Sequence, residues 1–325
     1  MKAIYHSKYG SPSNLRLLDI DKPTPKNNEV LIRNLASSIN SFDWDIMTGR
    51  TYIYRLMFGL TKPKINFMGC DVAGVIESVG SDITQFKVGD EVFGDLSQHN
   101  FNGFTEYVCA PEKFIAKKPE NASFTQAAAI PQGGILALQS LKLFKDIKPH
   151  HTILINGAGG SVGPFALQMA KLHGATVTCV DSEIKLDMLR SLGADHVIDY
   201  KKEDFTKNGQ QYDLIIEPMI KRSVIRYTKS LKPNGRLVVV GGKVGLILQM
   251  FFIGSILSIL TSKKYGLLIH RPNADDLQFL KDLFEQGKIK SIIEKTYPLE
   301  DVALALQHYG DGLAIGKLVV KIADK

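Results

Sequence analysis

Residues 153–175 read ILINGAGGSVGPFALQMAKLHGA, an apolar strand-like run that passes through a glycine-rich loop into a helix-like run. Glycines let the backbone turn tightly and approach a pyrophosphate, and the following helix offers free N–H groups and a partial positive charge at its first turn. A second strand-like run, residues 176–181, follows at the spacing typical of a dinucleotide-binding unit. The stretch therefore predicts a loop that binds the phosphates of a dinucleotide.

Strand-like and helix-like runs alternate from residue 151 onward. Alternation of this kind is typical of parallel strands joined by crossover helices. We therefore predict an α/β fold with a doubly wound, six-stranded parallel sheet. The predicted strands are residues 152–156, 176–181, 196–198, 213–216, 236–240 and 266–269, and the predicted helices are 162–173, 183–191, 220–231 and 275–285.

The first 120 or so residues have a different pattern, with short β-branched runs separated by turn-forming clusters, which is typical of a small barrel or sandwich. A helix is predicted at 125–144, and the chain ends in a predicted helix at 300–309 and a strand at 317–322, which we expect to return to the first domain. The domain prediction is therefore residues 1–124 with 290–325, and residues 125–289. The predicted strands of the first domain are residues 2–6, 15–20, 29–39, 72–79, 91–96 and 104–109.

The composition is globular, with 44% hydrophobic and 22% charged residues in 325. The formal charge is +7, but the basic residues form no block of five or six, which does not favour a nucleic-acid partner. Three cysteines lie far apart, which fits a reducing compartment, and the N-terminal residues lack the apolar region of a signal peptide. The apolar stretch 246–260 is shorter than the ~20 residues that span a bilayer. We expect a soluble, cytoplasmic protein.

The end of the second predicted strand bears on the choice between NAD and NADP. Asp181 is placed to accept hydrogen bonds from a ribose diol, which favours NAD. Lys185, one helical turn later, is placed to meet a 2′-phosphate, which favours NADP. Each residue also has an ordinary structural interpretation, a helix cap for Asp181 and an exposed helix lysine for Lys185.

Several motifs together resemble the medium-chain dehydrogenase/reductases, in particular their zinc-free, quinone oxidoreductase-like branch. The most similar subgroup contains chloroplast-envelope quinone oxidoreductase homologues and bacterial proteins described as NAD(P)-dependent alcohol dehydrogenases. This resemblance covers the whole chain and implies a GroES-like β-barrel catalytic domain and a Rossmann domain. The motifs are PTPKNNEVLIR (23–33), SINSFDWDIMTG (38–49), GCDVAGVIESVG (69–80), VGDEVFG (88–94), LGADHVIDYKKEDF (192–205) and GLAIGKLVV (312–320).

The resemblance also implies that zinc is absent. Zinc-dependent relatives carry a cysteine where this chain has Asn40, and Gly-His-Glu where it has Gly69-Cys70-Asp71. Catalytic zinc needs three protein ligands and structural zinc needs four, which these residues do not supply. His99 is a loop histidine by this interpretation.

The resemblance places Asn40 beside the nicotinamide, and Lys185 and Tyr200 at the 2′-phosphate. We therefore expect NADPH as the preferred cofactor, with NADH as a possible one because of Asp181. Gly241 and Gly242 fall where the backbone passes the nicotinamide, and Lys317 remains in a tail that otherwise departs from the relatives. The predicted cofactor-binding residues are Asn40, Gly157, Gly160, Ser161, Val162, Gly163, Asp181, Ser182, Lys185, Tyr200, Gly241, Gly242 and Lys317.

Without a metal to polarise it, a hydride acceptor must be activated by its own conjugation, as quinones and α,β-unsaturated carbonyls are. We therefore predict a reductase of small lipophilic quinones or enones. Tyr52 is the candidate proton donor, and solvent is the alternative. Two other functions stay open: an NAD(P)-linked alcohol dehydrogenase, and a non-catalytic NADPH-binding protein that binds RNA or has a structural role.

Residues 246–260 have four interpretations: a lining for the acceptor pocket through Met250, Phe251 and Phe252, ordinary core, a subunit contact, or a peripheral membrane contact. The neighbouring run 266–269 is a predicted edge strand, and pairing two such edges would remove an exposed edge. We therefore expect a homodimer.

Overall fold

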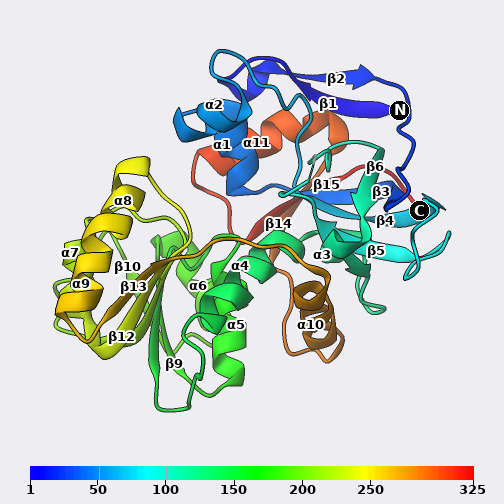
Figure 1. Ribbon diagram of the computed structural model, residues 1–325. Coiled ribbons are helices and arrows are strands. Elements are labelled where there is room, and N and C mark those ends of the chain that lie inside the picture. The colour runs from blue at the N-terminus through cyan, green and yellow to red at the C-terminus, as the bar shows by residue number, and fades with distance from the viewer. Residues whose placement is uncertain (51, 100) are drawn as a thin grey trace. The chain divides into compact units, whose positions relative to one another are not determined.

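The computed structural model describes residues 1–50, 52–99 and 101–325, and the side chains of residues 52–54 lie outside the described set (Figure 1). The chain divides into two compact units, residues 1–135 with 271–325, and residues 136–270. The predicted fold class is confirmed: the first unit contains a mainly antiparallel, GroES-like barrel sheet, in which only β14 and β15 pair parallel among the described strands, and the second contains a six-stranded parallel sheet.

The first unit is built on a seven-stranded sheet in the order β14-β15-β3-β4-β5-β7, with β6 also paired to β3. A separate two-stranded sheet pairs β1 (Lys2–His6) with β2 (Leu15–Asp19). β15 comes from the end of the chain and pairs antiparallel with β3, so that Val319 lies opposite Ser38. The strands of the large sheet are β3 (Glu29–Ser38), β4 (Asp71–Val79), β5 (Glu91–Asp95), β6 (Tyr107–Pro111), β7 (Ile115–Lys117), β14 (Ile293–Pro298) and β15 (Lys317–Lys321).

Helices of the first unit surround this sheet. They are α1 (Ser41–Thr48), α2 (Tyr52–Phe58), α3 (Phe124–Ala128), α10 (Ala274–Glu285) and α11 (Val302–Gly310), and α4 (Pro131–Lys142) crosses the division between the units. The single helix predicted at 125–144 is thus two helices. Pro131 lacks an N–H and disfavours a helical residue before it, so one helix ends and a second begins there.

The second unit has the strand order β10-β9-β8-β11-β12-β13, with every neighbouring pair parallel (Figure 1). In chain order this is 3-2-1-4-5-6, the arrangement of dinucleotide-binding sheets, in which ligands bind at the carboxyl ends of the strands. The strands are β8 (Thr152–Asn156), β9 (Thr176–Asp181), β10 (His196–Asp199), β11 (Tyr212–Glu217), β12 (Leu231–Val239) and β13 (Lys264–Leu267).

Helices of the second unit include α5 (Gly163–Leu172), α6 (Glu183–Ser191) and a short α7 (Val224–Tyr227). A continuous helical segment then runs from α8 (Val244–Gln249) through a π-helical turn η4 (Met250–Gly254) into α9 (Ser255–Leu260). In the described part of the chain no helix is long and apolar enough to cross a membrane. The bounds of β8 and β9 match the prediction, whereas β12 begins at Leu231, five residues earlier than predicted, because Leu231 already pairs with Tyr212 of β11.

Candidate active site

Asn40 lies two residues after the end of β3 and directly precedes α1, and it is buried (1% exposed). Its Nδ2 donates to Asp71 Oδ2 at 2.8 Å and to the Ser38 carbonyl at 3.3 Å. Its Oδ1 accepts from Lys317 Nζ at 2.6 Å. A carboxylate at the nitrogen and an ammonium at the oxygen fix which way the amide points. Asn40 is therefore held rigidly by three residues of the same unit.

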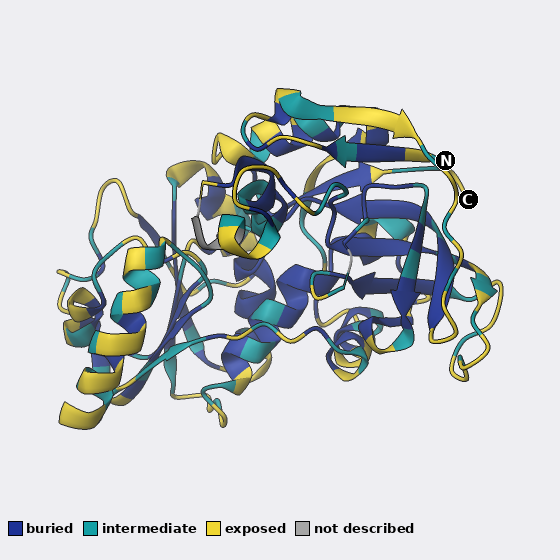
Figure 2. Cartoon of the chain, turned by 45° about the horizontal axis from the view of Figure 1, so that its top comes forward, coloured by how far each residue is buried: buried dark blue, intermediate teal, exposed yellow. Residues whose placement is uncertain are grey.

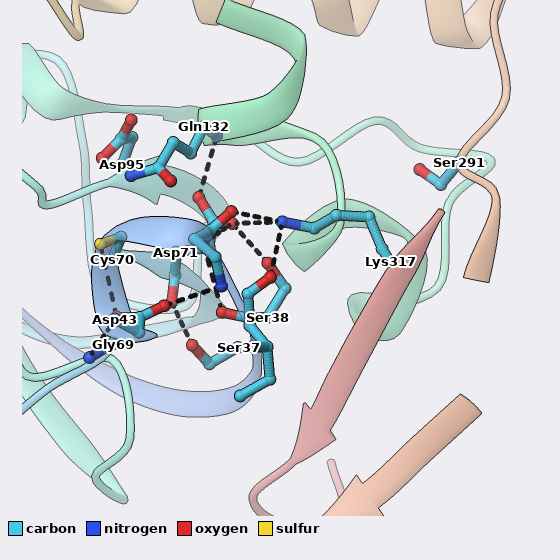
Figure 3. Close-up of polar contacts among 12 residues, drawn as sticks. Ser37, Ser38, Asp43, Gly69, Cys70, Asp71, Asp95, Gln132, Ser291 and Lys317 are labelled. Atoms are coloured by element: carbon cyan, nitrogen blue, oxygen red, sulfur yellow. Dashed lines mark hydrogen bonds and ion pairs between the residues drawn. The ribbon is translucent and has the colours of Figure 1, made fainter. Parts of the chain in front are cut away.

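Asp71, the first residue of β4, lies at the centre of this cluster and is fully buried (Figure 3). Its carboxylate accepts from Lys317 Nζ at 3.2 Å, from the backbone N–H of Gln132 at 2.9 Å and from the Ser38 hydroxyl. Burial raises the pKa of Asp71, and the Lys317 ammonium opposes that rise. The arrangement is a buried ion pair with most of its hydrogen-bonding capacity used, which is the condition for such a pair to be tolerated.

The position of Lys317 follows from the pairing of β15 with β3. Val319 lies opposite Ser38, and the N–H of Ile39 donates to the carbonyl of Leu318 at 2.9 Å. Extending that antiparallel register by one more pair places Lys317 opposite Asn40. The two residues are 277 positions apart in the chain, so the sheet, not the local sequence, brings them together.

Asp43, in the first turn of α1, is a second buried carboxylate beside this cluster (Figure 3). It accepts the N–H groups of Asn40 at 2.9 Å and Gly69 at 3.1 Å, and a weak bond from the Cys70 thiol at 3.5 Å. Burial raises the pKa of Asp43 to about 7. Asp43 can therefore hold a proton near neutral pH, in direct contact with the backbone of Asn40.

The predicted phosphate loop connects β8 to α5 in the second unit. Gly157 has a positive φ of 80°, which favours glycine, and its N–H donates to the Val180 carbonyl at 2.8 Å. A Cβ on Gly163 would lie 2.1 Å from the Ala158 carbonyl oxygen, so only glycine fits where α5 begins. Gly160, Ser161 and Val162 complete the turn between them. The loop thus has the tight form that a pyrophosphate site requires.

Four further predicted residues lie together beside this loop. Asp181 ends β9, and its carboxylate accepts the N–H of Gly159 at 2.7 Å and of Ser182 at 2.8 Å. Lys185 Nζ is 3.8 Å from Asp181 Oδ1, and both side chains are about nine-tenths buried. Tyr200, which is half exposed, donates its N–H to the Asp181 carbonyl at 3.2 Å. Asp181 therefore ties the glycine loop to the residues predicted to bind the cofactor ribose.

Gly241 and Gly242 follow β12, on the carboxyl side of the same sheet. The N–H of Ile220 donates to the Gly241 carbonyl at 2.9 Å, and a Cβ on Gly242, whose φ is 150°, would lie 2.5 Å from Ile220 Cγ2. The loops after β8, β9, β10 and β12 therefore all carry predicted cofactor residues at one edge of the sheet. Tyr52 begins α2, but its side chain, the predicted proton donor, lies outside the described residues.

Comparisons with known proteins give the family. A model described as Alcohol dehydrogenase GroES-like domain matches residues 26–120, and one described as Zinc-binding dehydrogenase matches residues 192–320. The chain is 32% identical to the chloroplast envelope quinone oxidoreductase homolog of Arabidopsis thaliana, over 99% of this chain and 98% of that protein. It belongs to the quinone oxidoreductase branch of the medium-chain dehydrogenase/reductases.

As a member of this branch, the protein is an oxidoreductase, and two further comparisons agree. It is 32% identical to the NADPH-dependent alkenal/one oxidoreductase of Arabidopsis thaliana, over 98% of this chain and 79% of that protein. Its structure matches that of the quinone oxidoreductase from Coxiella burnetii with a TM-score of 0.87 and 29% identity, covering 99% of each chain.

The expected cytoplasmic location is contradicted by these comparisons. The two Arabidopsis relatives are named for the chloroplast envelope and the chloroplast, and so are relatives from Triphysaria versicolor and spinach (Spinacia oleracea). The cytoplasmic prediction rested on the lack of a recognisable leader and on cysteine usage. Neither feature distinguishes the cytoplasm from another reducing compartment, and this is the reason for the error.

One family model is named for zinc, but the residues at the family's zinc positions do not fit that ion. Zinc binds thiolates, neutral imidazoles and carboxylates. The buried Cys70 thiol donates to Asp43 Oδ1 at 3.5 Å. Asn40 and Asp71 already bind the ammonium of Lys317. Within residues 1–50, 52–99 and 101–325 no group of three His, Cys, Asp or Glu side chains is placed to hold a metal. We therefore derive no step through zinc.

The sequence interpretation missed three buried carboxylates that organise these regions, Asp43, Asp71 and Glu217. Asp71 was considered only as an insufficient zinc ligand, although a charged residue opening the apolar run DVAGVI is itself a signal. Glu217 ends β11 and accepts from Asn156 Nδ2 at 2.7 Å and from the Tyr227 hydroxyl at 2.7 Å. Burial raises the pKa of Glu217 to about 7. An acidic residue at the end of a buried strand was the available clue.

Proposed function

We propose that the protein is an NADPH-dependent, zinc-independent reductase that transfers hydride to quinones or α,β-unsaturated carbonyls. The observation that carries the proposal is the set of loops at the carboxyl edge of the parallel sheet. There the glycine loop after β8 is bonded through Asp181 to the segment that contains Ser182 and Lys185. This arrangement suits a dinucleotide better than any other common ligand.

Cofactor binding is assigned to the second unit. The N–H groups from Gly160 to Gly163 bind the pyrophosphate, and Ser182, Lys185 and Tyr200 bind the adenosine ribose and its 2′-phosphate. Asp181 is assigned to stabilising the loop conformation and not to binding a ribose diol. Each of its carboxylate oxygens already accepts a backbone N–H. Gly241 and Gly242, after β12, are assigned to the nicotinamide half. The choice of NADPH rests on this division of roles.

Hydride is supplied by the nicotinamide when the cofactor is bound. In the first unit, Lys317 and Asp71 hold Asn40 in one orientation, and Asn40 positions the nicotinamide. The buried ammonium of Lys317 leaves no room for a catalytic metal cation among these residues, so the acceptor is one that conjugation activates. Tyr52 or solvent then protonates the enolate or quinol oxygen of the reduced acceptor. Turnover by Tyr52→Phe separates these alternatives, because a large loss of kcat would identify Tyr52 as the proton donor.

The first test is binding of NADPH and of NADH to the purified protein without substrate, followed by turnover with a quinone and an enone. We expect NADPH to bind more tightly and to be oxidised when the acceptor is added. Tighter binding of NADH would give Asp181 the deciding role. Binding of neither dinucleotide would overturn the proposal. A simple alcohol whose oxidation a chelator abolishes would revive the zinc dehydrogenase alternative.

We also propose a homodimer. β13 ends the order of the parallel sheet, so its outer edge has no strand partner among the described residues. Pairing of two β13 edges across a two-fold axis would satisfy these backbone groups. Light scattering coupled to size-exclusion chromatography tests this directly, and a mass of about one chain would exclude it.

A further inference from the structure

Two polar side chains end the two central strands of the parallel sheet. Asn156 is the last residue of β8, and Glu217 is the last residue of β11. β8 and β11 lie next to each other, and the chain continues from β8 to one side of the sheet and from β11 to the other (Figure 1). Ligands of such sheets bind outside the carboxyl ends of the strands, where the strand order reverses. Glu217 therefore lies at the position in the sheet where we expect the dinucleotide.

Glu217 is buried, with 1% of its surface exposed, and neutral groups hold its carboxylate. The central strands are buried along most of their length and are drawn in dark blue (Figure 2). Asn156 Nδ2 donates to Glu217 Oε1 at 2.9 Å and to Oε2 at 2.7 Å. The hydroxyl of Tyr227, a fully buried residue, donates to Oε2 at 2.7 Å. The carboxylate thus has hydrogen-bond donors on both oxygens, and these donors are uncharged.

The charged groups near Glu217 compensate its charge only in part. Among the described residues no cation forms an ion pair with this carboxylate. Lys221 and Arg222, in the loop that follows β11, attract its charge from a greater distance, and Arg222 also lies 3.7 Å from Asp204. On the β12 side, Val239 lies opposite Glu217 and brings no charge. A negative charge on Glu217 is therefore costly in the free protein.

Asp71 of the first unit shows the contrast, because the ammonium of Lys317 lies 3.2 Å from its carboxylate. A buried carboxylate with a cation in contact is held in its ionised form, whereas one held by neutral donors more readily takes up a proton. Burial raises the pKa of Glu217 to about 7, against the opposing effect of its hydrogen bonds and of the two cations. Glu217 can therefore change its charge near neutral pH.

The cluster accommodates Glu217 with or without a proton. The ionised carboxylate accepts from the Tyr227 hydroxyl, and the protonated one can donate to the same hydroxyl oxygen across the same 2.7 Å. Oε1 can accept from Asn156 at 2.9 Å in both states. The change of charge consequently requires no movement of the strands.

Resting on the function proposed above, we propose that Glu217 takes up a proton from solvent when the dinucleotide binds. Asn156 joins its carboxylate to the residue that directly precedes the glycine loop 157–163, to which we assign the pyrophosphate. The phosphates bring negative charge to this edge of the sheet, and a nearby like charge favours the neutral form of a carboxyl group. Binding and protonation therefore favour each other, and the dinucleotide binds more tightly at lower pH.

The test is titration calorimetry of the full-length protein with NADPH and with NADH, in two buffers of different ionisation enthalpy at pH 7.5. If binding raises the pKa of Glu217 by about one unit, the parent takes up about half a proton at Glu217 per dinucleotide. NADH lacks the 2′-phosphate, a group that itself titrates near neutral pH. Comparison of the two cofactors therefore separates the protein's proton from that of the ligand.

Glu217→Gln keeps the shape of the side chain but cannot ionise, and it should take up about half a proton less than the parent with both cofactors. The matched control is Asp213→Asn, which removes a carboxylate near the start of the same strand. Asp213 holds the N–H of Thr152 at 2.7 Å, at the opposite edge of the sheet from the dinucleotide. We expect Asp213→Asn to take up as many protons as the parent.

The affinity for NADH should also depend on pH. In the parent it should fall about tenfold between pH 6 and pH 9, and Glu217→Gln should lose this fall. Tyr227→Phe provides a second variant that keeps the ionisable group. It removes a hydrogen bond to the ionised carboxylate, so the fall in affinity should move to higher pH.

Equal proton uptake by the parent and by Glu217→Gln overturns the inference, and so does a parent that takes up no proton with NADH. Weaker binding by Glu217→Gln at every pH, with unchanged proton uptake, also overturns it and makes Glu217 only a structural support of the loop. The dinucleotide binds in each of these outcomes, so the proposed reductase stands. Binding of neither dinucleotide overturns both proposals.

Discussion

Two buried aspartate–lysine pairs, one in each unit, differ in what they hold. Asp71 and Lys317 lie 3.2 Å apart, with side chains 0% and 1% exposed, and are separated by 246 residues in the chain. Asp181 and Lys185 lie 3.8 Å apart, about a tenth exposed, and are four residues apart. The first pair joins two strands of the barrel sheet and fixes Asn40. The second lies beside a glycine loop and a half-exposed tyrosine, where we propose that the cofactor binds.

The contrast teaches that the same chemistry can serve the fold in one place and recognition in another. A pair sealed from water is costly to break, because each partner leaves a buried charge behind. A pair at the edge of a phosphate loop can exchange one partner for a phosphate, because the lysine keeps a charged partner when it does so. Substitutions in the two pairs should therefore be detected by different measurements.

The largest effect is expected from breaking the sealed pair. Lys317→Ala leaves Asp71 buried without its cation and should lower the free energy of unfolding by about 3–5 kcal/mol. Denaturant unfolding followed by circular dichroism measures this. Lys321→Ala, on the same strand but half exposed, is the control and should change it by less than about 1 kcal/mol. A stable Lys317→Ala protein would show that the pair does not hold the sheet.

Gly160→Asp tests whether the loop of the second unit serves binding and not folding. A Cβ at Gly160 meets only the Gly157 carbonyl, at an ordinary 3.7 Å, so the fold should tolerate it. The added carboxylate would face the phosphates, and NADPH affinity should fall about a hundredfold, or ~2.7 kcal/mol. Gly160→Ala separates bulk from charge. Unchanged affinity in Gly160→Asp, measured by fluorescence titration, would remove this loop from the phosphate site.

Breaking the second pair, Asp181 and Lys185, should have a smaller and more selective effect. Lys185→Ala removes one charge-assisted contact and should weaken NADPH about tenfold, ~1.4 kcal/mol, with little change for NADH. Lys202→Ala, an exposed lysine paired with Glu183, is the control. Isothermal titration with both cofactors gives the ratio. Equal losses for NADPH and NADH would mean that Lys185 supports the loop without contacting the 2′-phosphate.

A last effect concerns the slope of stability against pH. The folded protein binds the proton of Asp43 up to about pH 7, whereas the unfolded chain releases it near pH 4. The stability that this proton contributes is complete below about pH 4 and is lost as the pH rises to 7. Asp43→Asn should therefore make unfolding less pH-dependent between pH 4 and 7, and exposed Asp324→Asn should not. An unaltered slope in Asp43→Asn would show that Asp43 is ionised in the folded protein.

Regular local patterns made most of the fold predictable. β8 and β9 were predicted with their observed bounds because a run of β-branched residues ended at glycine or at a helix cap. The helix at 125–144 was wrong in its middle, where a single proline overrides a helical apolar pattern. β12 was predicted too short because its first residues contain Pro233 and Asn234, which normally indicate a loop.

The site was predictable only where its residues are local. Only α5 and β9 separate the loop 157–163 from the segment after β9, and spacing in the sequence alone places the two together. Asn40 and Lys317 were named separately, but nothing in the sequence says that they touch, because their contact depends on the register between β15 and β3.

The place of β15 has a consequence for how the chain acquires its structure during synthesis. β15 lies between β14 and β3 in the barrel sheet, so the first unit is incomplete until residue 321 has been made. The second unit, residues 136–270, is continuous and can fold while the rest is still being translated. Until Lys317 arrives, Asp71 has no cation and favours a hydrated, open sheet. The strands of the N-terminal segment therefore stay without their last partner strand until the end of the chain has been made.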